Sequence, residues 1–174
     1  MKYKELYNEY NSLLSRRNDY TKILSTLKEG YISIKMISGK QYSYLQKKVD
    51  GRISSKYIKE DMLPQVQAEL QQRNDIEKEI DLINEQLDKL EIAAKVLDKS
   101  LYHKLIILRR CSLMDAMPVE LRKKSLAFGN AMTALEGIPA SEDTEMTLSS
   151  WAAGRHSFRD GYLQTLEKYH LIEV

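Results

Sequence analysis

The residues best suited to acid–base, nucleophilic or metal chemistry in this chain are three histidines and one cysteine: His103, His156, His170 and Cys111. No two histidines stand four residues apart, so no helix presents a pair of imidazoles to a metal ion. Cys111 lies in an apolar stretch, which favours a small core residue over a nucleophile. The chain also lacks a glycine-rich phosphate loop and a Gly-x-Ser-x-Gly motif. We therefore expect no catalysis, no metal site and no cofactor.

A different kind of site lies near the C-terminus, where a predicted helix ends on a carboxylate and a helix-stopping glycine, Glu136 and Gly137. Pro139, Ser141-Glu142, Trp151-Ala-Ala-Gly154, Ser157-Phe158 and Leu166-Glu-Lys-Tyr169 follow in that order. This succession, over residues 125–170, resembles the small three-helix antitoxins of the VbhA type, which hold Fic-domain toxins inactive.

The resemblance implies an inhibitory helix of pattern (Ser/Thr)-x-x-x-Glu-(Gly/Asn). In that family the glutamate, here Glu136, enters the toxin's nucleotide site and pairs with an arginine that otherwise holds the ATP γ-phosphate. Asn130, Thr133 and Gly137 then join Glu136 as residues that bind the partner. Met132 stands where the family has Ser or Thr, and Thr133 comes one residue later, about 100° around a helix. The alternative is an interaction domain of similar fold without inhibitory activity.

Residues 31–58 alternate apolar and polar side chains around turns at Ser38-Gly39 and Asp50-Gly51, which predicts a three-stranded antiparallel meander. The meander resembles an uncharacterised bacterial module that combines it with a coiled coil. The residues that carry this resemblance are Gly30, Gly39, Lys40, Tyr42, Tyr44, Leu45, Gly51, Arg52, Lys56, Tyr57 and Ile58. Similar pieces occur near DNA-recombination proteins, and a basic ribbon can contact phosphates; the contacts would be Lys35, Lys47, Lys48, Arg52 and Lys56. The opposing interpretation makes the tyrosines core residues and the lysines protection of the sheet edges.

Few glycines and prolines, 7 and 3 in 174 residues, favour long helices as the elements that position these sites. Helices are predicted over 3–28, ended by Gly30, and over 61–99, 101–117, 119–136, 142–153 and 158–170. The expected fold class is mainly α: a long helical hairpin or coiled coil with the meander, plus a C-terminal three-helix antitoxin-like unit. The expected domains are 1–100 and 101–174.

The helix 61–99 needs a partner, because its apolar residues form a narrow coiled-coil seam. The seam steps by three and four through Ile80, Ile83, Leu87, Leu90, Ala94, Leu97 and Leu101. Either the helix 3–28 or a second copy of the chain, in a homodimer, could cover it.

Charge is unevenly distributed: residues 1–60 carry 13 basic and 6 acidic side chains, and residues 61–99 carry 5 and 10. This pattern suits either a nucleic-acid surface or complementary faces within the chain. No apolar stretch is long enough for a membrane span or a signal peptide, so we expect a cytoplasmic bacterial protein. The leading expectation is an antitoxin-like inhibitor that binds a Fic-type adenylyltransferase toxin. The alternative is a DNA-associated regulatory or structural coiled-coil protein that uses the basic meander.

Overall fold

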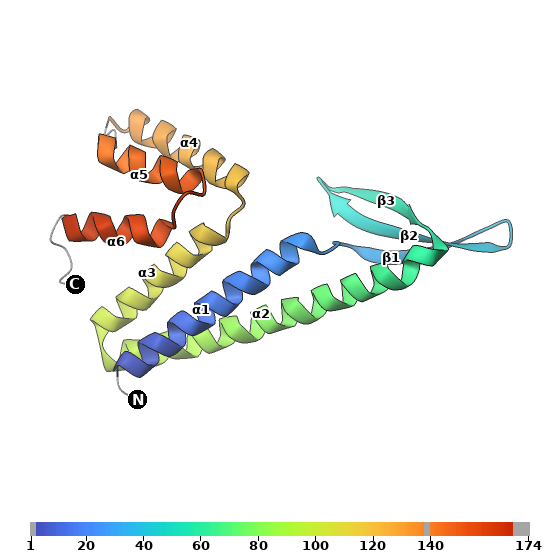
Figure 1. Ribbon diagram of the computed structural model, residues 1–174, viewed down its shortest axis with the longest axis horizontal. Helices are drawn as coiled ribbons and strands as arrows, with labels where there is room; N and C mark the ends of the chain where they lie inside the picture. The colour runs from blue at the N-terminus through green and yellow to red at the C-terminus, as the bar shows by residue number, and fades with distance from the viewer. Residues whose placement is uncertain (1–2, 138–139, 169–174) are drawn as a thin grey trace. The chain divides into compact units, whose positions relative to one another are not determined.

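The computed structural model describes residues 3–137 and 140–168. Within these ranges the chain forms six α-helices and one three-stranded antiparallel sheet (Figure 1), which confirms the mainly α fold class. Pro139 and the end of the last predicted helix, 169–170, lie outside the described residues. The elements are α1 (Tyr3–Thr26), β1 (Tyr31–Ile37), β2 (Lys40–Val49), β3 (Arg52–Ile58), a short 3-10 helix (Glu60–Met62), α2 (Leu63–Leu97), α3 (Lys99–Ala116), α4 (Val119–Leu135), α5 (Glu142–Ala152) and α6 (Phe158–Lys168).

The chain divides into two compact units, each described by itself. The sheet unit is Ser15–Asp88, and the helical unit combines Met1–Leu14 with Lys89–Val174. Helices α1 and α2 each contribute residues to both units. The two domains expected from the sequence, 1–100 and 101–174, stay a prediction.

In the sheet unit, the strands follow the order β1-β2-β3 with antiparallel pairing throughout. Two-residue turns join them, and all four turn residues have positive φ: Ser38 (50°), Gly39 (76°), Asp50 (49°) and Gly51 (78°). Such turns match the right-handed twist of a hairpin, which is why Ser-Gly and Asp-Gly predict them. The predicted meander is therefore present, with the turns at the predicted residues.

The α1 and α2 segments of the sheet unit lie antiparallel, because residues later in α1 contact residues earlier in α2. Arg16 lies 3.9 Å from Glu79, the Arg73 guanidinium donates to the Leu24 carbonyl at 3.2 Å, and the Lys28 ammonium lies 2.7 Å from Glu69.

Gly30 plays a different part from the predicted helix cap, since α1 already ends at Thr26. Its φ is +123°, and a Cβ there would lie 2.2 Å from the Gln46 carbonyl oxygen. Gly30 therefore lets the chain pass close to β2 as it enters the sheet.

Burial confirms most of the predicted seam of α2. Ile83, Leu87 and Ala94 are almost fully buried, whereas Leu97 is 53% exposed because α2 ends there. Ile76 is also buried and, with Arg73, continues the spacing of three and four toward Val66. The antiparallel α1 segments therefore supply cover for α2 within one chain.

Polar side chains cap three helices of the helical unit, and the sequence predicts two of these caps, Ser141 and Ser157. The side chains of Asp98, Ser141 and Ser157 accept backbone N–H bonds at the starts of α3, α5 and α6. Among the helices of the described ranges, none combines the length and apolar character that crossing a membrane requires.

The centre of the α4–α6 region is Trp151, which is 2% exposed and packs edge-to-face on Phe158 at 5.2 Å between ring centres. Gly161 keeps α6 close to α5, since a Cβ there would lie 2.6 Å from the Thr147 methyl carbon. The helical unit therefore has its own core around these three helices.

Candidate functional site

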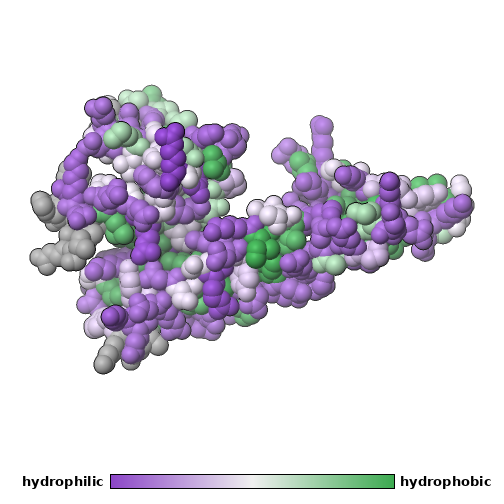
Figure 2. Space-filling model, viewed as in Figure 1, coloured by the Kyte–Doolittle hydropathy of each residue, from purple (hydrophilic) through white to green (hydrophobic). Residues whose placement is uncertain are grey.

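Helix α4 buries none of its side chains, although it is 17 residues long. Four large apolar residues, three, four or seven positions apart, are exposed along it: Leu121 (48%), Phe128 (69%), Met132 (42%) and Leu135 (82%). At 100° per residue they fall within about 60° of one another, on a single side of the helix. We call these four residues the α4 stripe, and Figure 2 shows pale green, apolar atoms over the α4 region.

Glu136 lies at the end of the α4 stripe, as the C-cap residue of the helix (φ −79°, ψ −4°). Gly137 follows with φ +70°, the left-handed conformation that ends a helix. The side chain of Glu136 is exposed, and among residues 3–137 and 140–168 it has no hydrogen bond or ion pair. This carboxylate can therefore accept a partner's cation without first breaking a contact of its own.

Of the other two predicted binding residues, Thr133 has its hydroxyl engaged, whereas the Asn130 side chain is exposed. The Thr133 hydroxyl donates to the Asn130 carbonyl at 3.1 Å, within the same helix. Met132, at the position of the family's hydroxyl residue, belongs to the α4 stripe. Among these positions, Glu136 alone therefore offers a free charged group.

Arg122, a residue that the sequence interpretation missed, fixes the position of α4. Its guanidinium donates from Nε to the Met117 carbonyl (2.9 Å), from Nη1 to the Trp151 carbonyl (3.2 Å) and from Nη2 to the Asp115 carbonyl. It also lies 5.6 Å from the centre of the Trp151 ring. One side chain therefore joins the ends of α3 and α5 to the start of α4.

The register of the sheet divides the five predicted DNA contacts between its two faces. Lys35 pairs with Tyr42, so Lys35 and Lys48 lie on the face of Tyr42, Tyr44 and Tyr57. The other three, Lys47, Arg52 and Lys56, lie on the opposite face. All five side chains are exposed, but they do not form one surface.

The face with Lys47 and Lys56 borders a groove of about 920 Å³ within the sheet unit. Apolar residues from the sheet, α1 and α2 line the groove: Leu24, Leu45, Ile58, Met62 and Val66. Lys28 also lines it, but the hydrogen bond from this lysine lowers the pKa of Glu69, and the pair neutralises its charge. This face is buried at Ile58, which is only 6% exposed, whereas Ile34 and Met36 on the same face are each 62% exposed.

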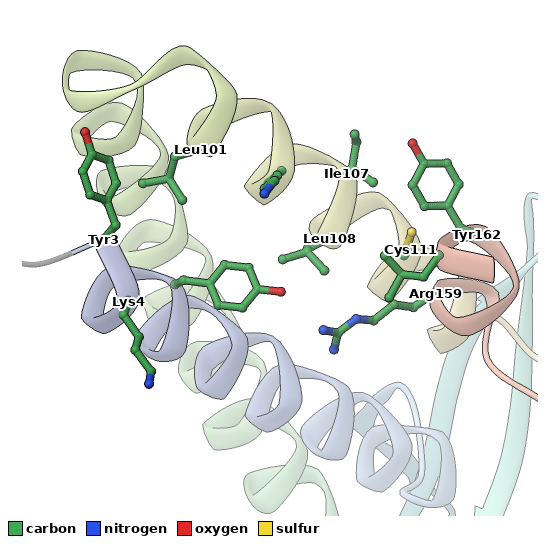
Figure 3. A pocket seen from close by; sticks show the side chains of 11 residues that line it. Tyr3, Lys4, Leu101, Ile107, Leu108, Cys111, Arg159 and Tyr162 are labelled. Carbon is green, nitrogen blue, oxygen red and sulfur yellow. The ribbon is translucent and has the colours of Figure 1, made fainter. Parts of the chain in front are cut away.

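A second cavity, of about 440 Å³, lies in the helical unit between the start of α1, α3 and α6. Figure 3 shows the Arg159 side chain extending from α6 toward the middle of the cavity, while Lys4 points away. Burial raises the pKa of the Cys111 thiol, an effect that the Asp115 charge reinforces and the Arg159 charge opposes. A thiol kept protonated in this way is a poor nucleophile or ligand. Within the described ranges, no three His, Cys, Asp or Glu side chains are grouped to hold a metal ion.

The sheet, most of α1 and the first residues of α2 match a known domain family. Residues 4–68 form a DUF6788 domain. DUF6788 is a domain of unknown function, and the match covers most of α1, the whole sheet and the first residues of α2. No curated protein and no solved structure matches the chain. Helices α3–α6, and Glu136 with them, lie outside the DUF6788 match.

Proposed function

We propose that this chain is an antitoxin-like inhibitor that binds a Fic-type adenylyltransferase through α4 and blocks it with Glu136. The observation that carries the proposal is the state of α4: a helix with no buried side chain, an exposed apolar stripe and a free carboxylate at its end. Most helices are stabilised by burying an apolar face. A partner that covers the α4 stripe would supply that burial and receive Glu136 at a defined point.

The inhibition follows from ion-pair chemistry. A carboxylate and a guanidinium form a bidentate, charge-assisted pair, so Glu136 would occupy an arginine of the toxin's nucleotide site. That arginine could then no longer orient the terminal phosphate of ATP. Because transfer from a nucleotide depends on positioning of its phosphates, ATP would bind in a pose from which AMP is not transferred.

The two parts of the site have separate roles in this proposal. The α4 stripe supplies affinity through apolar burial, while Glu136 supplies inhibition. Since the Thr133 hydroxyl is bonded to the Asn130 carbonyl, inhibition would not use a hydroxyl from this turn of the helix. Arg122 would keep the stripe and the carboxylate in place by holding α4 on α3 and α5.

The proposal predicts that a gene for a Fic-domain protein lies beside the gene for this chain. The test uses the full chain and that Fic-domain protein, with labelled ATP to follow adenylylation. Glu136→Gln removes the charge but keeps the size of the side chain. We expect this variant to bind the Fic protein within about threefold of the wild type, yet to leave adenylylation active. The matched control is Glu142→Gln, an exposed carboxylate in the first turn of α5, which should still inhibit fully.

A second variant tests the docking surface. Phe128→Ala together with Leu135→Ala removes the two most exposed side chains of the stripe, so it should weaken binding at least tenfold without changing the fold. Full inhibition by Glu136→Gln would contradict the role of the carboxylate. Unchanged binding by the double variant would contradict the docking surface, and absence of any complex would remove the proposal.

A further inference from the structure

One face of the sheet carries a cluster of tyrosines and lysines. By the pairing register, Tyr31, Lys35, Tyr42, Tyr44, Lys48 and Tyr57 all project from it, and we call these six residues the tyrosine face. The opposite face contains Leu45 and the buried Ile58 and borders the groove lined by α1 and α2. Helices α1 and α2 line the groove on that opposite face, where Tyr57 of the edge strand β3 also reaches it, so the tyrosine face is the side of the sheet turned away from the two helices.

The tyrosine rings are partly fixed by one another. The Tyr57 ring centre lies 6.1 Å from that of Tyr42 and 5.7 Å from that of Tyr44, with tilted planes. The Lys35 ammonium lies 4.8 Å from the centre of the Tyr44 ring. Nevertheless, Tyr57 and Tyr31 remain 50% and 54% exposed. A pre-ordered aromatic cluster with half-open rings can stack a flat ligand at little entropic cost.

The charge of the sheet limits what that ligand can be. Residues 31–58 carry six basic side chains and one acidic side chain, Asp50, which lies in a turn. The strands themselves contain no carboxylate, so both faces repel cations and attract a polyanion. Lys48 and Lys35 bring this positive charge to the tyrosine face.

We infer that the tyrosine face binds single-stranded nucleic acid, with bases stacked on Tyr31 and Tyr57 and phosphates held by Lys35 and Lys48. Base stacking on aromatic side chains needs unpaired bases, which a duplex does not offer. The two tyrosines lie on the outer strands and two residues apart in register, which places them about 12 Å apart across β2, so the face spans two or three nucleotides. This replaces the predicted ribbon contact with duplex DNA by contact with a single strand.

The inference is independent of the proposed inhibition, because the tyrosine face and α4 share no residue and can be varied separately. Binding would be measured with the full chain by fluorescence anisotropy at about 50 mM salt. The probes are a labelled 12-nucleotide single-stranded DNA of mixed sequence, the same sequence as RNA, and the DNA as a duplex. We expect either single strand to bind at least tenfold more tightly than the duplex.

Substitutions separate stacking from charge. Tyr57→Leu keeps an apolar side chain against its neighbours but removes the ring, and should weaken single-strand binding about tenfold. Tyr31→Leu, at the first residue of β1, should do the same without disturbing the ring cluster. Tyr3→Leu is the matched control, since Tyr3 is also 54% exposed but lies in α1, and its binding should be unchanged. Lys48→Gln should reduce the salt dependence by roughly one phosphate contact.

Equal affinity for single strand and duplex, together with unchanged binding by Tyr31→Leu and Tyr57→Leu, would overturn the inference, because contact would then depend on phosphates alone. Displacement of the single strand by an equal charge concentration of polyglutamate would also overturn it, since that would indicate a surface for any polyanion. If none of the three probes binds, the inference is overturned outright.

Discussion

Arg122 provides the sharpest test of how the helical unit is built, because one side chain joins three helices. Its guanidinium donates to carbonyls of Asp115, Met117 and Trp151, near the ends of α3 and α5. Carbonyls in the last turn of a helix lack partners within that helix and need another donor. Lysine at this position keeps the charge but has no planar fork, so Arg122→Lys should leave most of these carbonyls without the guanidinium, although the Trp151 carbonyl keeps the bond from the Gly154 N–H at 2.8 Å.

The expected cost can be worked from the contacts. Each hydrogen bond contributes about 1 kcal/mol net, and a lysine would retain one of the three. The cation–π contact with the Trp151 ring adds about 0.5–1 kcal/mol, which the ammonium would lose by moving. The sum is about 2–3 kcal/mol, a large part of the roughly 5–15 kcal/mol that stabilises a typical domain.

The measurement is urea unfolding followed by tryptophan fluorescence. Trp151 is the only tryptophan and is 2% exposed in the helical unit, so its emission reports on the region that Arg122 holds. We expect the unfolding midpoint of Arg122→Lys to fall by about 1 M urea. The control is Arg155→Lys, an exposed arginine just after α5, which should stay within about 0.5 kcal/mol of the wild type.

A midpoint for Arg122→Lys equal to that of the control would refute this account. It would mean that the three carbonyls find water as readily as they find the guanidinium, and that packing alone positions α4. A selective loss for Arg122→Lys would instead support a polar joint as the element that sets where Glu136 lies.

Three further predictions concern other parts of the chain. Gly161→Ala should destabilise the protein by about 1–3 kcal/mol, because its Cβ would overlap an α5 side chain. Gly129→Ala has open space around it and should stabilise the protein by about 0.5–1 kcal/mol. Similar urea unfolding curves for the two variants would contradict this difference. Cys111 is 2% exposed, and burial raises its pKa, so mass spectrometry should detect alkylation far more slowly in the native chain than in urea; equal rates would show an accessible thiolate. Lys28→Met should raise the pKa of Glu69 toward the ordinary carboxyl value in an NMR titration, since the Lys28 hydrogen bond lowers it. Because the folded-state pKa is lowered, the pair stabilises the fold at neutral pH and loses that effect as the pH falls through this pKa; a wild-type advantage that grows in acid would contradict the assignment.

Much of the fold could be predicted because the residues that begin and end a helix act through local backbone chemistry. Glycines with positive φ stand after α4 and α5, at Gly137 and Gly154, and serines cap α5 and α6, as their chemistry requires. The turn glycines of the meander, Gly39 and Gly51, are local signals too, because they adopt the positive φ that the hairpin turns require. Asp98 was missed as the cap of α3, since a carboxylate in an acidic helix resembles any other surface residue.

The candidate site was less predictable, because it depends on which faces other elements cover. Periodicity places Phe128 and Leu135 on one side of a helix, but only packing shows that α5 does not lie against that side. Alternation likewise gives the sheet two faces with lysines on both, and the side that receives α1 and α2 decides which tyrosines stay open. The five basic residues could be identified as exposed, yet their division into two sets required the pairing register.

The position of Glu136 at a C-cap has an electrostatic consequence for recognition. The last carbonyls of a helix give its C-terminus a partial negative charge, and Glu136 adds a full one at the same place. Within the described ranges no cationic side chain pairs with Glu136, so the end of α4 carries negative charge that nothing neutralises. A guanidinium arriving from another molecule would meet both charges at once, which favours arginine over neutral donors there. Its capture should weaken steeply with added salt, whereas apolar contacts along the rest of the helix should not.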